Sequence, residues 1–179
     1  VEDFDAVVLC CGATKPRDLP VEGRELNGVH FAMEFLTTNT QGLLELKDVT
    51  SFETAAKNKD VVVIGGGDTA MDCVRTSIRQ KAKSVKCLYR RDRENMPGSA
   101  REVGNAIEEG VEFIWLTSPK SFIGNSKVES VEVNKMKLGD PDSSGRRRPE
   151  IEVGSEYKIK ADLVIKSLGF DPENLPKLF

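Results

Sequence analysis

Val-Val-Val-Ile-Gly-Gly-Gly-Asp-Thr-Ala, residues 61–70, is the stretch of this chain that decides its fold. The four β-branched residues predict a buried strand, the glycines predict a tight turn, and the residues after them predict a helix. Gly65 permits the turn, Gly67 lets the backbone approach a pyrophosphate, and the small Ala70 lets the helix pack close to the strand. The helix N-terminus would then offer free N–H groups to the phosphates.

The segment therefore predicts a dinucleotide site, and the alternative is a tight turn that binds nothing. The candidate cofactor-binding residues here are Gly65, Gly66, Gly67, Asp68, Thr69 and Ala70.

A pair of arginines follows the next predicted strand, Ser84–Tyr89. An NAD site usually has an acidic residue near this point to hold the adenosine ribose, whereas Arg90 and Arg91 suit the 2′-phosphate of NADP. Asp92 comes next and could serve as the ribose acid. We expect Asp92 instead to leave the pocket, or to pair with Arg91 or Arg93. NADP(H) is therefore the predicted cofactor.

The composition is that of an ordinary globular domain. The 179 residues provide one sizeable core, and a net charge of −3 gives no reason to expect nucleic acid or membrane as a partner. No apolar run is long enough to span a bilayer, and no secretory signal is recognised. The four cysteines have no spacing typical of a redox pair, a zinc site or an iron–sulfur cluster. We therefore predict no metal site. Three of the four cysteines lie in predicted strands or helix faces, where we expect buried thiols, and we expect a reducing, cytoplasmic location.

The order of elements predicts an α/β fold, a Rossmann-like parallel sheet with a β-meander. This order is typical of the NAD(P)-binding domain of a two-dinucleotide-binding flavoprotein reductase. The predicted strands are Phe4–Leu9, Val61–Ile64, Ser84–Tyr89, Val111–Leu116, Val128–Leu138, Ile151–Lys160 and Ala161–Leu168. The predicted helices are 29–38, 68–80 and one that begins at a Ser99–Glu102 capping box and ends at Gly110. The last two helices are expected to bury Met71, Val74, Ile78, Val103, Ala106 and Ile107.

Two similar apolar segments flank the glycine turn, Phe4–Gly12 and Leu163–Gly169, and each closes on a glycine. We expect the chain to leave a flavin domain through the first and to return to it through the second; the alternative is that both are ordinary sheet strands. The hypothesis divides the chain into three parts. Residues 1–40 are a hinge strand and its connection, 41–160 are the NADP(H)-binding domain, and 161–179 are the return hinge strand.

Several longer segments resemble the small (beta) subunit of bacterial NADPH-dependent glutamate synthase. They are Val61–Thr76, Leu88–Ser99, Glu108–Phe113, Gly139–Arg147 and Ala161–Pro172. The resemblance extends over nearly the whole chain. It implies an oxidoreductase that passes a hydride from NADPH to FAD and then electrons through iron–sulfur clusters to a large subunit. There, glutamate is made from glutamine and 2-oxoglutarate.

The resemblance also implies residue roles by position. It places Gly65, Gly67, Asp68 and Thr69 in the pyrophosphate turn, Arg90 and Arg91 at the 2′-phosphate, and Ser167, Leu168 and Gly169 along the cofactor. We expect Asp68 to cap the helix, because its carboxylate would repel a pyrophosphate. Hydride transfer needs no protein acid or base, so no catalytic residue is predicted. The single histidine, His30, is expected to have a packing or surface role.

The chain departs from the full pattern of that family. It has no cysteine cluster for iron–sulfur binding and no second glycine fingerprint for FAD, and it begins at Val1 rather than at a methionine. We therefore expect a domain of a longer protein, with FAD and the clusters outside this chain, that binds NADPH alone without turnover.

Three alternatives remain open. The same architecture recurs in dihydropyrimidine dehydrogenase and in ferredoxin:NADP-type reductases, so the final acceptor could differ. An electron-inactive docking domain is the second alternative. A thioredoxin-reductase-like enzyme is the third, and the missing Cys-x-x-Cys pair disfavours it.

Overall fold

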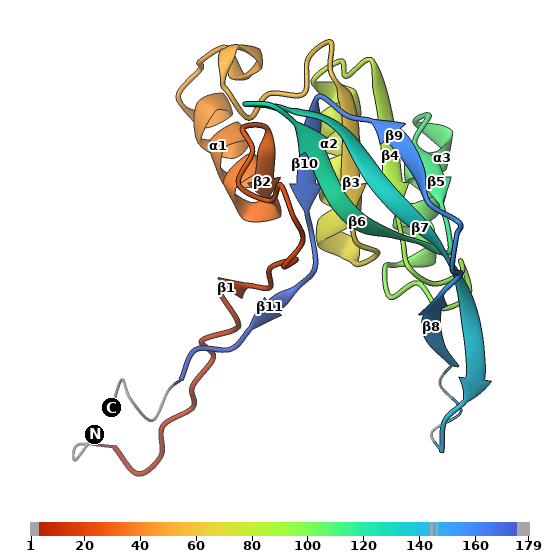
Figure 1. The fold of residues 1–179 in the computed structure, drawn as a ribbon. Helices are drawn as coiled ribbons and strands as arrows, with labels where there is room; N and C mark the ends of the chain where they lie inside the picture. The colour runs from red at the N-terminus through yellow and green to blue at the C-terminus, as the bar shows by residue number, and fades with distance from the viewer. Residues whose placement is uncertain (1–3, 144, 146, 175–179) are drawn as a thin grey trace.

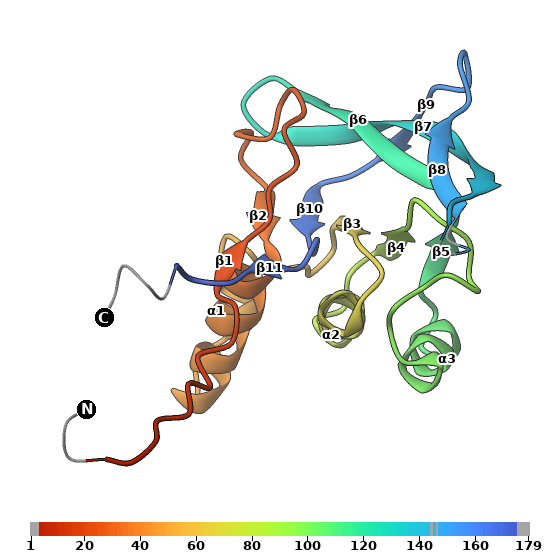
Figure 2. The same cartoon turned by 90° about the horizontal axis from the view of Figure 1, so that it is seen from below.

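The computed structural model describes residues 4–143, 145 and 147–174, and these form three layers. Figure 2 shows the layers edge-on, with helices on one face of a parallel sheet and antiparallel strands over the other face. The helices are α1 (Ala32–Leu44), α2 (Asp68–Arg79) and α3 (Ala100–Glu108), with a short 3-10 turn, η1, at Val49–Ser51. The predicted α/β, Rossmann-like class is confirmed.

The central sheet is parallel throughout, in the strand order β2-β10-β3-β4-β5 (Figure 1). Its strands are β2 (Val29–Phe31), β3 (Asp60–Ile64), β4 (Ser84–Leu88), β5 (Glu112–Ile114) and β10 (Leu163–Lys166). After β3 the chain adds β4 and β5 on one side of that strand, and it then returns to add β10 on the other side, so the order of strand addition reverses between β3 and β10. Ligands of such sheets bind outside the carboxyl ends of the strands at this reversal, so the topology points to the ends of β3 and β10.

Strand β3 has an unbroken apolar sequence because both of its faces are covered. Val61 and Val63 pack on the helical side, in a cluster with residues of α1, α2 and α3. Val62 and Ile64 pack on the opposite side, under the antiparallel strands. All four side chains are buried, which fixes the strand that leads into the glycine turn.

Helices α2 and α3 lie where they were predicted, but two details differ. Ser99 is the N-cap residue of α3, yet its side chain makes no capping hydrogen bond, so the predicted capping box is absent. Ile107 is 42% exposed, because the core-facing stripe of α3 consists of Val103 and Ala106. Gly110 ends the helix with a positive φ of 95°, as predicted for the residue after the C-cap.

The antiparallel layer corresponds to the predicted β-meander, and its first strand, β6, was not predicted. Its strands are β6 (Thr117–Gly124), β7 (Val128–Pro141), β8 (Arg147–Ile151) and β9 (Tyr157–Lys160). β7 pairs with all three of the others. The return strand predicted over Ile151–Lys160 is thus divided between β8 and β9, because the chain turns between them.

The N-terminal segment differs most from expectation. No strand forms at Phe4–Leu9, where the side chains are exposed and no described sheet offers a partner. A two-stranded antiparallel pair forms instead between β1 (Lys15–Pro16) and β11 (Phe170–Asp171), where the two chain ends run side by side (Figure 1). We call this pair the β1–β11 clasp. Strands β2 and β10, which fall in the predicted hinge segments, belong to the central sheet.

None of the helices in the described part of the chain has the length and apolarity needed to cross a membrane.

Candidate functional site

The glycine turn after β3 is shaped by close contacts with its neighbours. Gly65 has a φ of 144°, and a Cβ atom there would lie 2.0 Å from the carbonyl oxygen of Ser167. A Cβ on Gly66 would lie 2.5 Å from the Tyr89 ring. A Cβ on Gly67 would have no described atom within 4 Å. The first two glycines are therefore required for packing. Gly67 faces open space, where a ligand can approach the protein backbone.

Helix α2 begins directly after this turn. Its N-cap residue is Gly67, so no side chain caps the first N–H groups of the helix. The predicted role of Asp68 as the cap is therefore wrong, because Asp68 is already the first helical residue. Its Oδ1 instead accepts a hydrogen bond of 2.8 Å from the backbone N–H of Ser99. This contact holds the turn before α3 against the start of α2 and leaves the N–H groups of α2 available to a ligand.

The same turn is fixed from two further sides. Gly98 N–H donates to the Gly66 carbonyl at 2.8 Å. Behind the turn, the Cys87 thiol lies 3.3 Å from the Gly65 carbonyl oxygen, and its burial raises the pKa of the thiol to about 12. Cys87 is thus a neutral, structural thiol, and the glycine turn is held in place by these contacts with its neighbours.

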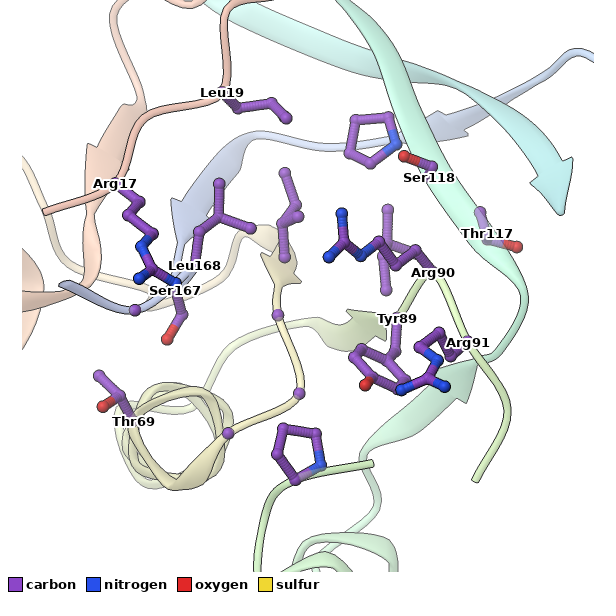
Figure 3. A pocket seen from close by; sticks show the side chains of 18 of the residues that line it. Arg17, Leu19, Thr69, Tyr89, Arg90, Arg91, Thr117, Ser118, Ser167 and Leu168 are labelled. Atoms are coloured by element: carbon purple, nitrogen blue, oxygen red, sulfur yellow. The ribbon is translucent and has the colours of Figure 1, made fainter. Parts of the chain in front are cut away.

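A cavity of about 470 Å³ opens above the turn, at the carboxyl ends of β3, β4 and β10 (Figure 3). Nine of the predicted site residues line it: Gly65, Gly66, Gly67, Thr69, Arg90, Arg91, Ser167, Leu168 and Gly169. Asp68 and Ala70 do not line it. Ala70 is fully buried against the core, which agrees with its predicted role in close helix packing.

The two arginines after β4 occupy different environments. Arg90 is exposed, and its side chain points into the cavity (Figure 3). Arg91 is only 7% exposed and donates through Nη2 to the Arg147 carbonyl at 3.1 Å. Its Nε is buried and has no hydrogen-bond partner among the described residues. Arg91 is therefore anchored under β8, while Arg90 is free to meet a ligand.

Asp92 lies outside the cavity lining. Its Oδ1 accepts hydrogen bonds from the backbone N–H and the side-chain amide of Asn95, at 2.9 and 2.6 Å. It pairs with neither Arg91 nor Arg93. Since this carboxylate is committed to a local turn, no acidic side chain among the described lining residues stands at the arginine end of the cavity to receive a ribose hydroxyl.

The end of β10 forms the opposite wall. Ser167 is 7% exposed, and its buried Oγ has no hydrogen-bond partner among the described residues. Gly169 has a φ of 86°, so the chain can turn away from the sheet there and enter the β1–β11 clasp.

Besides Ile64 and Leu88, the last residues of β3 and β4, sequence patterns missed eight lining residues, which are Arg17, Asp18, Leu19, Tyr89, Pro97, Thr117, Ser118 and Pro119. Tyr89 directly precedes the predicted arginines, so its place at the end of β4 was a usable signal. The others come from the N-terminal connection, from the turn before α3 and from β6, and only the tertiary fold brings them to the cavity.

Among the described residues that line the cavity, Asp18 is the single acidic one. Its Oδ1 lies 2.5 Å from Nζ of Lys166, a lysine that is 5% exposed and sits 3.9 Å above the Phe31 ring. The hydrogen bond from Lys166 holds the pKa of Asp18 below its usual value. Arg24 lies 3.5 Å from the other oxygen. The negative charge of Asp18 is thus balanced by two cations, and the cavity keeps a net positive lining.

No cysteine is among the described residues that line the cavity. Among the described residues, no cluster of histidine, cysteine and acidic side chains could hold a metal ion. Cys10 and Cys11 are exposed and Cys73 and Cys87 are buried, so the expectation of mostly buried thiols holds for two of the four.

Comparison with protein families and curated proteins gives a consistent result. Residues 2–177 match the pyridine nucleotide-disulphide oxidoreductase family. A putative glutamate synthase [NADPH] small chain of Cereibacter sphaeroides is 55% identical over 175 residues, which cover 98% of this chain and 42% of that protein. The glutamate synthase [NADPH] small chain of Escherichia coli is 48% identical over 178 residues, 98% of this chain and 38% of that protein. The chain thus spans well under half the length of these relatives.

Solved structures agree on the fold. FprA, an oxidoreductase of Mycobacterium tuberculosis, superposes with a TM-score of 0.77 at 20% identity, over 97% of this chain and 52% of FprA. A thioredoxin reductase of T. acidophilum gives a TM-score of 0.62 at 19% identity, over 90% of this chain and 43% of that one. The fold is therefore that of the reductases with two dinucleotide-binding domains.

Proposed function

The chain belongs to the pyridine nucleotide-disulphide oxidoreductase family. From that premise we propose that it is the NADPH-binding domain of a glutamate synthase small subunit. When bound, NADPH supplies a hydride for FAD, and the electrons pass through iron–sulfur clusters to a large subunit that makes glutamate from glutamine and 2-oxoglutarate. FAD, the clusters and the large subunit lie outside this chain in the proposal. The closeness to small chains of glutamate synthase from several bacteria supports this assignment.

The observation that carries the proposal is the cavity at the glycine turn, with arginines at one end and no free acid there. Gly67 leaves room for a diphosphate beside the uncapped N–H groups of α2. Arg90 extends into the cavity at the end of β4, where the adenosine ribose of a dinucleotide lies in this topology. A guanidinium group there favours a 2′-phosphate over a free ribose hydroxyl.

Two buried polar atoms of the cavity lining also fit a polar ligand. The Ser167 Oγ and the Arg91 Nε lack partners among the described residues, and such groups are rare in folded proteins unless something else satisfies them. These residues bind and orient the cofactor. They move no proton, because the chemistry belongs to the cofactors.

The flanking segments complete the proposal. We place the FAD domain of the parent protein beyond the β1–β11 clasp, where both chain ends leave the central sheet together. The apolar segment with Phe4, Val7, Val8 and Leu9 is exposed and would pack on that domain. Free thiols suit a reducing compartment, so a cytoplasmic location is part of the proposal.

A second candidate differs only in the electron acceptor. The NADPH-Fe(3+) oxidoreductase subunit beta of Geobacter sulfurreducens is 40% identical over 96% of this chain. A putative oxidoreductase of E. coli, AegA, is 43% identical over 99% of it. Segments similar to this chain therefore occur in proteins with different names, and in this second candidate the acceptor depends on parts outside the chain. An electron-inactive docking domain would retain the fold and would have no need of the nucleotide cavity.

Calorimetric titration of the chain with NADPH and NADH tests the proposal. We expect NADPH to bind at least tenfold more tightly than NADH, because only NADPH offers a 2′-phosphate to Arg90. Arg90→Gln should reduce this preference to less than about threefold by weakening NADPH binding alone. Arg79→Gln is the matched control, since Arg79 is an exposed arginine at the far end of α2. Equal affinity of the unaltered chain for both nucleotides would exclude the 2′-phosphate site, and binding of neither would exclude the function.

A further inference from the structure

Arg17 reaches the cavity from the N-terminal connection, on the opposite side of the glycine turn from Arg90. Figure 3 shows its guanidinium group beside Ser167 and Leu168, while Arg90 extends from the end of β4. The two arginines thus stand at opposite ends of one cavity, and they come from segments far apart in the sequence.

The β1–β11 clasp holds Arg17 in this position. Its backbone N–H donates to the Gly169 carbonyl at 3.0 Å, and its Nε donates to Oδ1 of Asp171 at 2.7 Å. Both partners belong to the segment that leaves the end of β10. The clasp therefore fixes the backbone and the base of the guanidinium group together.

The outer part of the guanidinium group remains available. Nη1 and Nη2 of Arg17 make no hydrogen bond or ion pair with any described residue, and the side chain is 56% exposed. Nη1 lies 3.8 Å from the position that a Cβ on Gly169 would take, an ordinary van der Waals distance, so the guanidinium group lies beside the Gly169 backbone. The geometry leaves two parallel donors facing the cavity, an arrangement that suits phosphate oxygens.

The charges around Arg17 favour an anion as well. Three arginines line the cavity, and its single acidic residue, Asp18, is paired with Lys166 and Arg24. The pairing of Arg17 with Asp171 uses only Nε. No free carboxylate among the described lining residues competes with a ligand phosphate for this end.

The topology identifies which part of a dinucleotide would lie there. In a sheet of this order the adenosine half crosses β4, and the other half crosses the strand beyond the reversal, which is β10 here. Arg17 stands at the end of β10. We propose that Arg17 binds the phosphate on the nicotinamide side of the diphosphate, a group that NADPH and NADH share. This inference rests on the proposed function and adds to it a residue whose position depends on the clasp between the two chain ends.

Three ligands separate this role from that of Arg90. NADPH carries both the 2′-phosphate and the nicotinamide-side phosphate, NADH carries only the second of these, and 2′,5′-ADP carries only the first. Arg17→Gln should weaken the binding of NADPH and NADH by the same factor, about tenfold, and change that of 2′,5′-ADP by less than twofold. Arg90→Gln should weaken NADPH and 2′,5′-ADP and leave NADH unchanged.

Lys15→Gln is the matched control, because Lys15 lies in β1, is exposed, and does not line the cavity. It should bind all three ligands as the unaltered chain does. Arg17→Lys, which keeps the charge but loses the paired donors, should fall between the unaltered chain and Arg17→Gln. Urea midpoints of all variants should agree, since the Arg17–Asp171 pair is half-exposed.

Unchanged affinity of Arg17→Gln for NADPH and NADH would overturn the inference and leave the proposed function standing. So would an equal loss for all three ligands, because that would place Arg17 on the adenosine side. If the unaltered chain binds none of the three ligands, the proposed function itself fails.

Discussion

The carbonyl oxygen of Ser167 lies 2.0 Å from the position that a Cβ atom on Gly65 would occupy. The two residues follow neighbouring parallel strands, β3 and β10, and Ser167 N–H donates to the Ile64 carbonyl at 2.8 Å. The ends of β3 and β10 therefore lie so close together, at the reversal of the strand order, that only glycine fits at position 65. This contact fixes the floor of the cavity.

Gly65→Ala should destabilise the fold by about 3 kcal/mol, because the new methyl group overlaps a backbone atom and the φ of 144° strains any other residue. Urea unfolding followed by circular dichroism measures this loss. A destabilisation below about 1 kcal/mol would mean that the end of β10 moves easily, contrary to the packing described.

Gly67→Ala should separate binding from folding. Its backbone, with φ −90° and ψ 178°, is open to alanine, and a Cβ there meets no described atom within 4 Å. We expect an unfolding free energy within about 1 kcal/mol of the unaltered chain. NADPH affinity should fall at least tenfold, since the methyl group occupies the space of the diphosphate. Unchanged affinity, measured by calorimetry, would place the diphosphate elsewhere.

Asp60 should contribute an acid-sensitive part of the stability. Lys160 at 2.8 Å, together with the Ser84 hydroxyl, lowers the pKa of this carboxyl from 3.8 to about 2. Because the folded pKa lies below the unfolded one, the contribution is complete above about pH 4 and is lost as the pH falls toward 2.

The contribution amounts to about 2 kcal/mol at neutral pH. Asp60→Asn should therefore be less stable than the unaltered chain at pH 7 and approach it near pH 2, as measured by unfolding at a series of pH values. NADPH binding at pH 7 is the internal control, since Asp60 lies at the start of β3 and outside the cavity lining. A stability difference that does not change with pH would contradict the assignment.

The thiols should divide into two classes. Cys10 and Cys11 are exposed, whereas burial raises the pKa of Cys73 and of Cys87. At pH 8 a thiol reagent such as Ellman's reagent should titrate two thiols in the native chain and four in denaturant, because buried neutral thiols react slowly. A rapid reaction of three or four native thiols would show that the core around Cys73 and Cys87 opens readily.

Local sequence was sufficient for the floor and one end of the cavity. The strand, turn and helix of 61–79 follow from short-range sterics, because an apolar β-branched run, a glycine turn and a helical face each depend on near neighbours. The same holds for Arg90 and Arg91, which follow β4 after the single residue Tyr89. The predicted strand at Phe4–Leu9 failed because an apolar run becomes a strand only where a sheet accepts it.

By itself, the sequence determined the Rossmann-like class, the glycine turn and the two arginines of the cavity lining, Arg90 and Arg91. Only the tertiary structure decided that Asp68 holds the turn before α3 against the start of α2, that Asp92 binds Asn95 outside the cavity lining, and that Arg17 enters the cavity lining. The reason is physical. β10 inserts between β2 and β3, about a hundred residues after β3, and its end pairs with the N-terminal connection in the β1–β11 clasp. Such long-range pairing is set by the packing of the whole sheet, and no local pattern of residues records it.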